Sequence, residues 1–172
     1  MPTSAGKTRS VDLILRGAFY SNRTSLAMVV APFRALCEEI RQSLFAAFSG
    51  EGINVDELSD VQQDDFDLEA FLSRRQVLVT TPERCLYLLR HSPEVTDTLG
   101  LLIFDEGHQF DSGSRGVTYE LLLTSLKTAV RPGTQIVLVS AVLNNAQAIC
   151  QLVARSMPRC AIIFAACSSL CN

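Results

Sequence analysis

Two short segments of the chain carry residue types suited to phosphate chemistry. The first covers residues 1–8, reads Met-Pro-Thr-Ser-Ala-Gly-Lys-Thr and precedes an amphipathic stretch. A phosphate-binding loop has the pattern G-x-x-x-x-G-K-[ST], and here Met1 stands where that pattern has its first glycine. In such loops, N–H groups at a helix start hold phosphate oxygens while the lysine reaches the β- and γ-phosphates. Because Gly-Lys-Ser/Thr occurs by chance in about one chain in ten of this size, the match is weak when taken alone.

The second segment places two adjacent carboxylates directly after an apolar run. Leu101 to Phe104 leads into Asp105 and Glu106, and His108 follows two residues later. An aspartate at the end of a strand can hold Mg²⁺, and an adjacent glutamate can polarise a water that attacks a phosphate. The alternative is an ordinary acidic turn after a strand. The Gly-Lys-Thr upstream favours the phosphate interpretation over that alternative.

The elements that must position these residues alternate between helical and strand patterns. Apolar residues at three- and four-residue spacing predict helices over 11–19, 33–48, 82–89, 119–126 and 149–153. Short continuous apolar runs predict strands over 26–31, 77–79, 101–104, 136–139 and 161–164. Such strands, separated by helices, predict an α/β fold with a parallel sheet covered by helices on both faces. Ligands of these sheets bind at the carboxyl ends of the strands, which is where both phosphate segments would lie.

Composition limits the classes of function. The net charge is −3, which argues against a broad basic surface for nucleic acid and leaves only local contacts. No apolar run approaches the roughly 20 residues that span a bilayer, and the first ten residues lack an apolar segment, so we expect a cytoplasmic protein without membrane contact. The six cysteines form no C-x-x-C pair and predict free thiols. Seven acids between Asp56 and Glu69 predict a solvated loop.

Three further motifs follow predicted strands. They are Ala-Pro-Phe-Arg-Ala-Leu at 31–36, Thr-Pro-Glu-Arg at 81–84 and Ser-Ala-Val at 140–142. With the two phosphate segments they make five motifs in an order that resembles the first RecA-like ATPase domain of DEAD/DEAH-box superfamily-two helicases. The resemblance covers residues 1–157 as a partial ATP-binding domain and leaves 158–172 as a divergent or irregular tail. It implies a RecA-like P-loop NTPase fold lacking its first strand.

The resemblance also implies ligands and residue roles. ATP and Mg²⁺ would be cofactors, and the phosphate backbone of RNA or DNA would be the partner. Nucleotide phosphates would contact Thr3, Ser4, Ala5, Gly6, Lys7 and Thr8, and Mg²⁺ would contact Thr8 and Asp105. Glu106 would be the catalytic base, with Asp105 and His108 as the other catalytic residues. Nucleic acid would contact Arg34, Thr81, Pro82, Glu83 and Arg84, and Ser140 and Ala141 would couple the two sites. Thr81 could instead serve only as a helix cap.

The implied function is ATP-dependent helicase activity, which needs a second RecA-like domain. We therefore expect the isolated chain to hydrolyse little ATP, since an arginine supplied from outside such a site is worth about 10³–10⁵ in rate. Without the strand that precedes the phosphate loop in this family, we also expect a chain of low stability. Two other interpretations stay open. One is a different P-loop ATPase that works as a switch, and the other is a degenerate, non-catalytic remnant of the fold.

Overall fold

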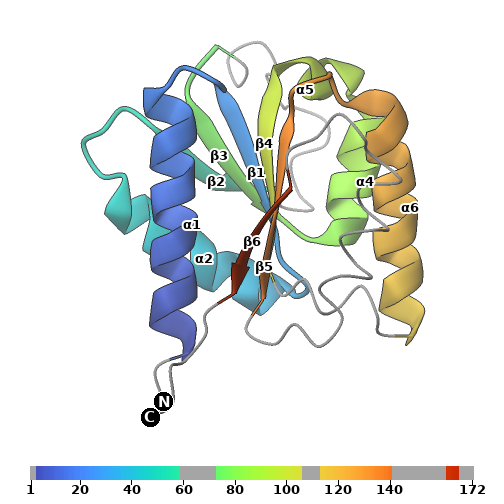
Figure 1. Ribbon diagram of the computed structural model, residues 1–172, viewed down its shortest axis with the longest axis horizontal. Helices are drawn as coiled ribbons and strands as arrows, with labels where there is room; N and C mark the ends of the chain where they lie inside the picture. Colours follow the sequence, from blue (N-terminus) through green and yellow to red (C-terminus); the bar gives the residue numbers. More distant parts are fainter. Residues whose placement is uncertain (1–2, 59–72, 106–112, 141–161, 167–172) are drawn as a thin grey trace.

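A computed structural model describes residues 3–58, 73–105, 113–140 and 162–166. Its centre is a six-stranded parallel sheet with the strand order β2-β3-β1-β4-β5-β6 (Figure 1). The strands are β1 (Leu26–Val30), β2 (Asn54–Glu57), β3 (Gln76–Thr80), β4 (Leu99–Asp105), β5 (Gln135–Ser140) and β6 (Ile162–Ala166). The helices are α1 (Thr3–Tyr20), α2 (Arg34–Ala47), α4 (Pro82–His91), α5 (Pro93–Thr98) and α6 (Gly113–Ala129).

Helices cover both faces of the sheet, because the inner strands are apolar on both sides. Successive residues of a strand point to opposite faces, so Met28 and Val30 belong to one buried cluster and Ala27 and Val29 to the other. The first cluster includes buried residues of α4, α5 and α6, and the second includes those of α1 and α2. Figure 1 shows the two layers on either side of the strands. The predicted parallel sheet with two covered faces is confirmed.

The strand register brings the predicted motifs to one edge of the sheet. Val30 pairs with Thr80 of β3 and with Phe104 of β4, and Asp105 pairs with Val139 of β5. Since all pairings are parallel, the last residues of these strands lie side by side. We call the edge formed by the ends of β1 to β5 the carboxyl edge.

The opposite edge fixes the direction of α1. A short turn connects Tyr20 to β1, and within it Thr24 Oγ1 accepts hydrogen bonds from Leu26 N at 3.1 Å and Gly100 N at 3.0 Å. The end of α1 is therefore tied to the starts of β1 and β4. Because α1 runs antiparallel to the strands, its first turn lies toward the carboxyl edge, and Figure 1 shows its dark-blue start on the side to which the β6 arrow points.

The sequence missed two elements, β2 and α5. Val55 is the only apolar residue of β2, which lies at the edge of the sheet and exposes Asn54 and Asp56. The prediction of a solvated loop was therefore wrong for Asp56 and Glu57, which are part of β2; residues 59–72 lie outside the described part of the chain. The six-residue α5 is too short to show a helical period, and it begins at Pro93.

The segment predicted as a phosphate loop forms the start of α1 instead. The prediction that the first helix begins after Thr8 was wrong, because the helix begins at Thr3. Gly6 is the weakest helix former among residues 3–8, and a long helix tolerates its cost of about 1 kcal/mol.

Candidate functional site

Asp105 is the best-placed of the predicted phosphate-site residues. Asp105 is the last residue of β4, at the carboxyl edge, and only 8% of its surface is exposed. The apolar run Leu101 to Phe104 fixes it there, because those four residues are fully buried between the two helix layers. A buried carboxylate at a strand end meets the chemical requirement for a Mg²⁺ ligand.

The first turn of α1 contains the residues that the sequence predicts to contact phosphates. In a helix that begins at Thr3, the N–H groups of Thr3, Ser4 and Ala5 have no acceptor within the helix, and a helix start favours anions. The N–H groups of Lys7 and Thr8 are in positions to bond within the helix. If the N–H groups of Lys7 and Thr8 are to hold phosphates, as they would in a phosphate-binding loop, the first turn of α1 must unwind. The Thr8 side chain is half-buried.

The donor types agree with a magnesium–nucleotide complex. Mg²⁺ in such sites is held by one or two protein oxygens together with phosphate oxygens and water. Thr8 and Asp105 supply one hydroxyl and one carboxylate from the two elements named above. Within the described ranges, no group of three or more His, Cys, Asp or Glu side chains could hold a metal ion by itself.

Two more helices begin at the carboxyl edge beside Asp105. Backbone N–H of Ala31 donates to Thr80 O at 3.0 Å, which ties the end of β1 to the end of β3. Phe33 and Thr81 are the N-cap residues of α2 and α4, and neither makes a side-chain cap hydrogen bond. Thr81 occupies the cap position without acting as a side-chain cap. Helix starts of this kind suit the phosphate groups of a nucleic-acid backbone.

The predicted nucleic-acid residues differ in exposure. Arg34 and Glu83 are exposed at the starts of α2 and α4, whereas Thr81 and Pro82 are buried. Arg84 is half-buried, and its Nη1 donates to Leu58 O and lies 3.9 Å from Glu57 Oε1. The structure therefore brings all five to the same edge, at the starts of α2 and α4.

A carboxylate pair lies next to Arg84, and sequence reasoning missed it. The carboxyl groups of Glu38 on α2 and Glu57 on β2 lie near enough to each other to shift each other's pKa. Arg41 donates two hydrogen bonds to the Glu38 carboxylate, from Nε to Oε2 at 2.8 Å and from Nη2 to Oε1 at 2.7 Å. The Arg41 hydrogen bonds lower the pKa of Glu38 to about 2, whereas burial and the nearby carboxylate of Glu38 raise the pKa of Glu57. The acid-rich sequence from Asp56 onward showed that charges gather there, but it did not indicate that Glu57 lies near Glu38.

Neither described cysteine has the properties of a nucleophile. Cys37 and Cys85 are free and buried, and burial raises the pKa of each thiol to about 12. Since the thiolate is the reactive form, both stay protonated and inert at neutral pH. This agrees with the predicted free thiols at these two positions.

The remaining predicted residues lie partly outside the described chain. Ser140 ends β5, opposite Ala166 of β6 in the strand register. Glu106, His108 and Ala141 belong to residues 106–112 and 141–161, outside the described ranges. Their roles stay predictions from the sequence.

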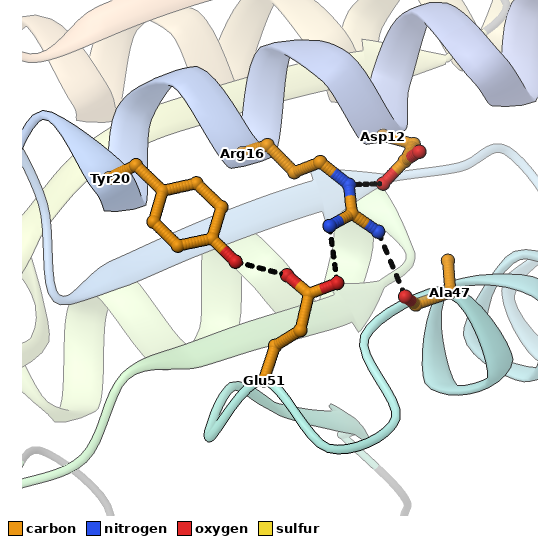
Figure 2. Close-up of polar contacts among 5 residues, drawn as sticks. All are labelled: Asp12, Arg16, Tyr20, Ala47 and Glu51. Carbon is orange, nitrogen blue, oxygen red and sulfur yellow. Dashed lines mark hydrogen bonds and ion pairs between the residues drawn. The ribbon is translucent and has the colours of Figure 1, made fainter.

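A polar network on the α1–α2 face holds the helix that starts at the site. Arg16 donates to Asp12 Oδ1 at 2.7 Å, to Ala47 O at 2.8 Å and to the Glu51 carboxylate (Figure 2). Tyr20 donates to the other oxygen of Glu51. The Arg16 guanidinium also lies 4.9 Å from the centre of the Phe48 ring. The i,i+4 spacing of Asp12 and Arg16 is visible in the sequence, but the contact with Glu51 is not.

Comparison with known proteins decides the family. The sequence profile of the DEAD/DEAH box helicase family matches residues 1–149. The chain belongs to the DEAD/DEAH box helicase family. This confirms the resemblance that the motifs indicated.

Relatives of this helicase-family chain are much longer proteins. The chain is 33% identical over 146 residues to the Hachiman protein HamB of Bacillus cereus. The matched region makes up 84% of this chain and 13% of HamB. The chain is 31% identical over 153 residues to the ATP-dependent DNA helicase Hel308 of Thermoplasma volcanium, covering 88% of this chain and 21% of that protein. The chain thus spans about an eighth to a fifth of these relatives.

Solved structures with the same fold are RecA-like helicase domains. A variant of S. cerevisiae Dbp5 bound to Gle1 and IP6 superposes with a TM-score of 0.60 at 20% identity, covering 83% of this chain and 34% of that one. A Dbp5 variant bound to Nup159, Gle1, IP6 and ADP gives a TM-score of 0.64 at 18% identity, covering 94% and 41%. At these identities the likeness concerns the fold, and it confirms the predicted RecA-like class.

Proposed function

We propose that this chain is the nucleotide- and nucleic-acid-binding part of an ATP-dependent helicase. The observation that carries the proposal is the carboxyl edge. It collects the start of α1, the buried Asp105 and the starts of α2 and α4 on adjacent strands. Family membership supports the ATPase class, and the edge supplies a place for both ligands.

The proposed site has two parts. Near α1 and β4, Lys7 and Thr8 would contact the nucleotide phosphates while Thr8 and Asp105 hold Mg²⁺, which would neutralise charge on the phosphates. Glu106 follows Asp105 directly and would orient the attacking water. Toward β2, the residues Arg34, Thr81 and Arg84 would contact the backbone of a single strand. Such contacts are to phosphates, so they carry little sequence specificity.

The partner and its location are proposals as well. Hel308 relatives are named as DNA helicases, but the phosphate contacts proposed here suit DNA and RNA alike, so both are tested below. A second RecA-like domain would complete the active site. Across the described ranges, no helix is long and apolar enough to cross a membrane. A cytoplasmic location stays a prediction from the sequence.

The direct test is single-turnover ATP hydrolysis with and without single-stranded DNA or RNA. The wild-type chain should hydrolyse ATP slowly, and single-stranded nucleic acid should raise the rate several-fold. Glu106→Gln should abolish hydrolysis because it removes the proposed base, at a cost of about 10²–10⁴ in rate, while ATP binding persists. A labelled γ-phosphate gives the sensitivity that a slow rate requires.

Each alternative function predicts a different result. Hydrolysis that DNA and RNA leave unchanged would indicate a P-loop switch and contradict the helicase proposal. A chain that binds no ATP and no nucleic acid would indicate a remnant of the fold.

A further inference from the structure

Phe33 is an exposed aromatic residue at the carboxyl edge. It is the last residue before α2 begins, and 49% of its surface is exposed. The two residues before it, Ala31 and Pro32, are buried. Phenylalanine is among the residue types most often buried, because a large apolar ring is unfavourable in water. The exposure of Phe33 therefore needs a reason.

Neither core packing nor helix capping accounts for a phenylalanine at this position. Phe33 belongs to neither of the two buried clusters, nor to the partly buried residues packed against them. As the N-cap residue of α2 it makes no side-chain cap hydrogen bond, since its ring has no acceptor. A serine or an aspartate would stabilise the helix start better. The residue type thus points to a contact outside the fold.

The backbone of Phe33 is held on both sides. Two residues earlier, Ala31 N donates to Thr80 O at 3.0 Å, and Phe33 O accepts from Cys37 N at 3.0 Å. Phe33 itself is extended, with φ −139° and ψ 146°. A phenylalanine side chain has only two rotatable bonds, so on a fixed backbone it loses little conformational entropy when a ligand covers it.

The surroundings of Phe33 suit a nucleic-acid strand. Arg34, the next residue, is exposed and positively charged. The strand β3, which leads to Thr81 and α4, pairs directly with β1, and paired strands lie about 4.8 Å apart. The residues proposed to contact phosphates therefore lie beside an exposed ring. Sites for single-stranded nucleic acid combine these two features, because positive charge holds the backbone while aromatic rings stack on the bases.

We propose that Phe33 stacks on an unpaired base of a nucleic-acid strand whose phosphates contact the starts of α2 and α4. This inference rests on the proposed function of the carboxyl edge and names the form of nucleic acid that the edge binds. Bases in a duplex are already stacked on each other, so the contact favours single strands. Every base has an aromatic face, so the contact tolerates any sequence and serves DNA and RNA alike.

The test compares oligonucleotides with and without bases. Dye-labelled oligo(dT) and oligo(U), and an abasic oligodeoxynucleotide of the same length, are bound to the chain and followed by fluorescence anisotropy. Phe33→Ala should weaken binding of oligo(dT) and oligo(U) by about 5–150-fold, the range for the loss of one stacked base. The affinity for the abasic strand should stay unchanged, which also shows that the variant is folded. Phe33→Tyr keeps the ring and should bind as wild type does.

Phe45→Ala is the matched control. Phe45 is the same residue type on the same helix and is 61% exposed, but it lies near the end of α2, away from the carboxyl edge. Phe45→Ala should bind all three oligonucleotides as wild type does. A loss equal to that of Phe33→Ala would contradict a stacking position at Phe33.

The abasic strand separates this inference from the function on which it rests. If Phe33→Ala binds oligo(dT) as tightly as wild type, or loses the same factor on the abasic strand, base stacking at Phe33 is overturned and phosphate binding at the carboxyl edge stands. If the wild-type chain binds none of the three oligonucleotides, the inference and the proposed nucleic-acid function are both overturned.

Discussion

At the scale of single residues, Arg16 determines how α1 is held. It joins α1 to the end of α2 and to the following turn through Ala47, Phe48 and Glu51. The hydrogen bonds with Glu51 and Asp12 raise the pKa of Arg16, and the bond from Arg16 lowers the pKa of Glu51. Both shifts mean that the charged pair is favoured in the folded chain. The network lies on the helix whose first turn is proposed to contact nucleotide.

Replacing Glu51 should therefore lower stability in a pH-dependent way. Because the folded-state pKa of Glu51 is lowered, its contribution is present above the ordinary value of about 4.3 and is lost as pH falls through the lowered pKa. Glu51→Gln should lower Tm by about 2–4 °C near neutral pH, and this difference should shrink below the ordinary value. Thermal melts across pH provide the measurement.

Glu120→Gln serves as the control, since Glu120 is exposed on α6. It should leave Tm nearly unchanged. A Glu51→Gln difference that is the same at neutral and acid pH would show that the loss is not electrostatic.

At the scale of elements, the turn between α1 and β1 fixes the register of β4. Thr24 packs against Gly100, and a Cβ added to Gly100 would lie 2.6 Å from Thr24 Cβ and 2.8 Å from Arg23 O. The Arg23 carbonyl is backbone and cannot turn away as a side-chain end can. Gly100 is thus needed for a close approach and not for an unusual φ.

Gly100→Ala should destabilise the fold by about 1–3 kcal/mol, the usual cost of overpacking. To make room for the new Cβ, α1 and β4 would have to move apart at the turn. That movement would also break the hydrogen bonds that Leu26 N and Gly100 N donate to Thr24 Oγ1. Gly17→Ala is the control of identical chemistry, because its Cβ would come no closer than 3.9 Å, to a flexible Arg23 side chain. Within a helix that change should stabilise by about 0.5–1 kcal/mol.

Urea unfolding midpoints compare the two alanine variants directly. Equal midpoints would contradict the close approach of Thr24 to Gly100. A lower midpoint for Gly17→Ala would mean that α1 does not continue as a helix through this residue.

Elements with a strong apolar period could be predicted from the sequence, and those held by tertiary contacts could not. Helices α1 and α2 and the buried strands β1, β3, β4 and β5 follow from runs that are apolar on the faces they bury. By contrast, β2 forms because Val55 packs in the core and its backbone pairs with β3, although Asn54 and Asp56 are exposed. Pairing with β3 and packing of Val55 in the core stabilise β2, although its sequence has little strand preference.

The candidate site divides in the same way. Asp105, Thr81 and Arg34 lie where the strand patterns predicted them, because chain direction and the parallel sheet alone bring strand ends together. The Glu38–Glu57–Arg84 contacts join three elements that are far apart in the sequence, so no local pattern could reveal them. The motif at residues 1–8 gave no indication that residues 3–8 begin a helix.

At the scale of the whole molecule, the account depends on the two ligand regions sharing one edge of one sheet. The strands between them are buried on both faces and pair in register from β2 to β5. A rigid sheet of this kind would keep the proposed nucleotide region and the proposed nucleic-acid region at a fixed separation. In the relatives, the part that matches this chain makes up 13% of HamB and 21% of Hel308.

The most direct test of the central claim is the affinity of the chain for a fluorescent ATP analogue with Mg²⁺ present. Lys7→Ala should weaken binding by about 10–100-fold, the cost of losing a charged hydrogen-bond donor to phosphate. Lys127→Ala, which removes the chain's other lysine from α6, should bind as wild type does. Equal affinities for wild type and Lys7→Ala would contradict a nucleotide site at the start of α1.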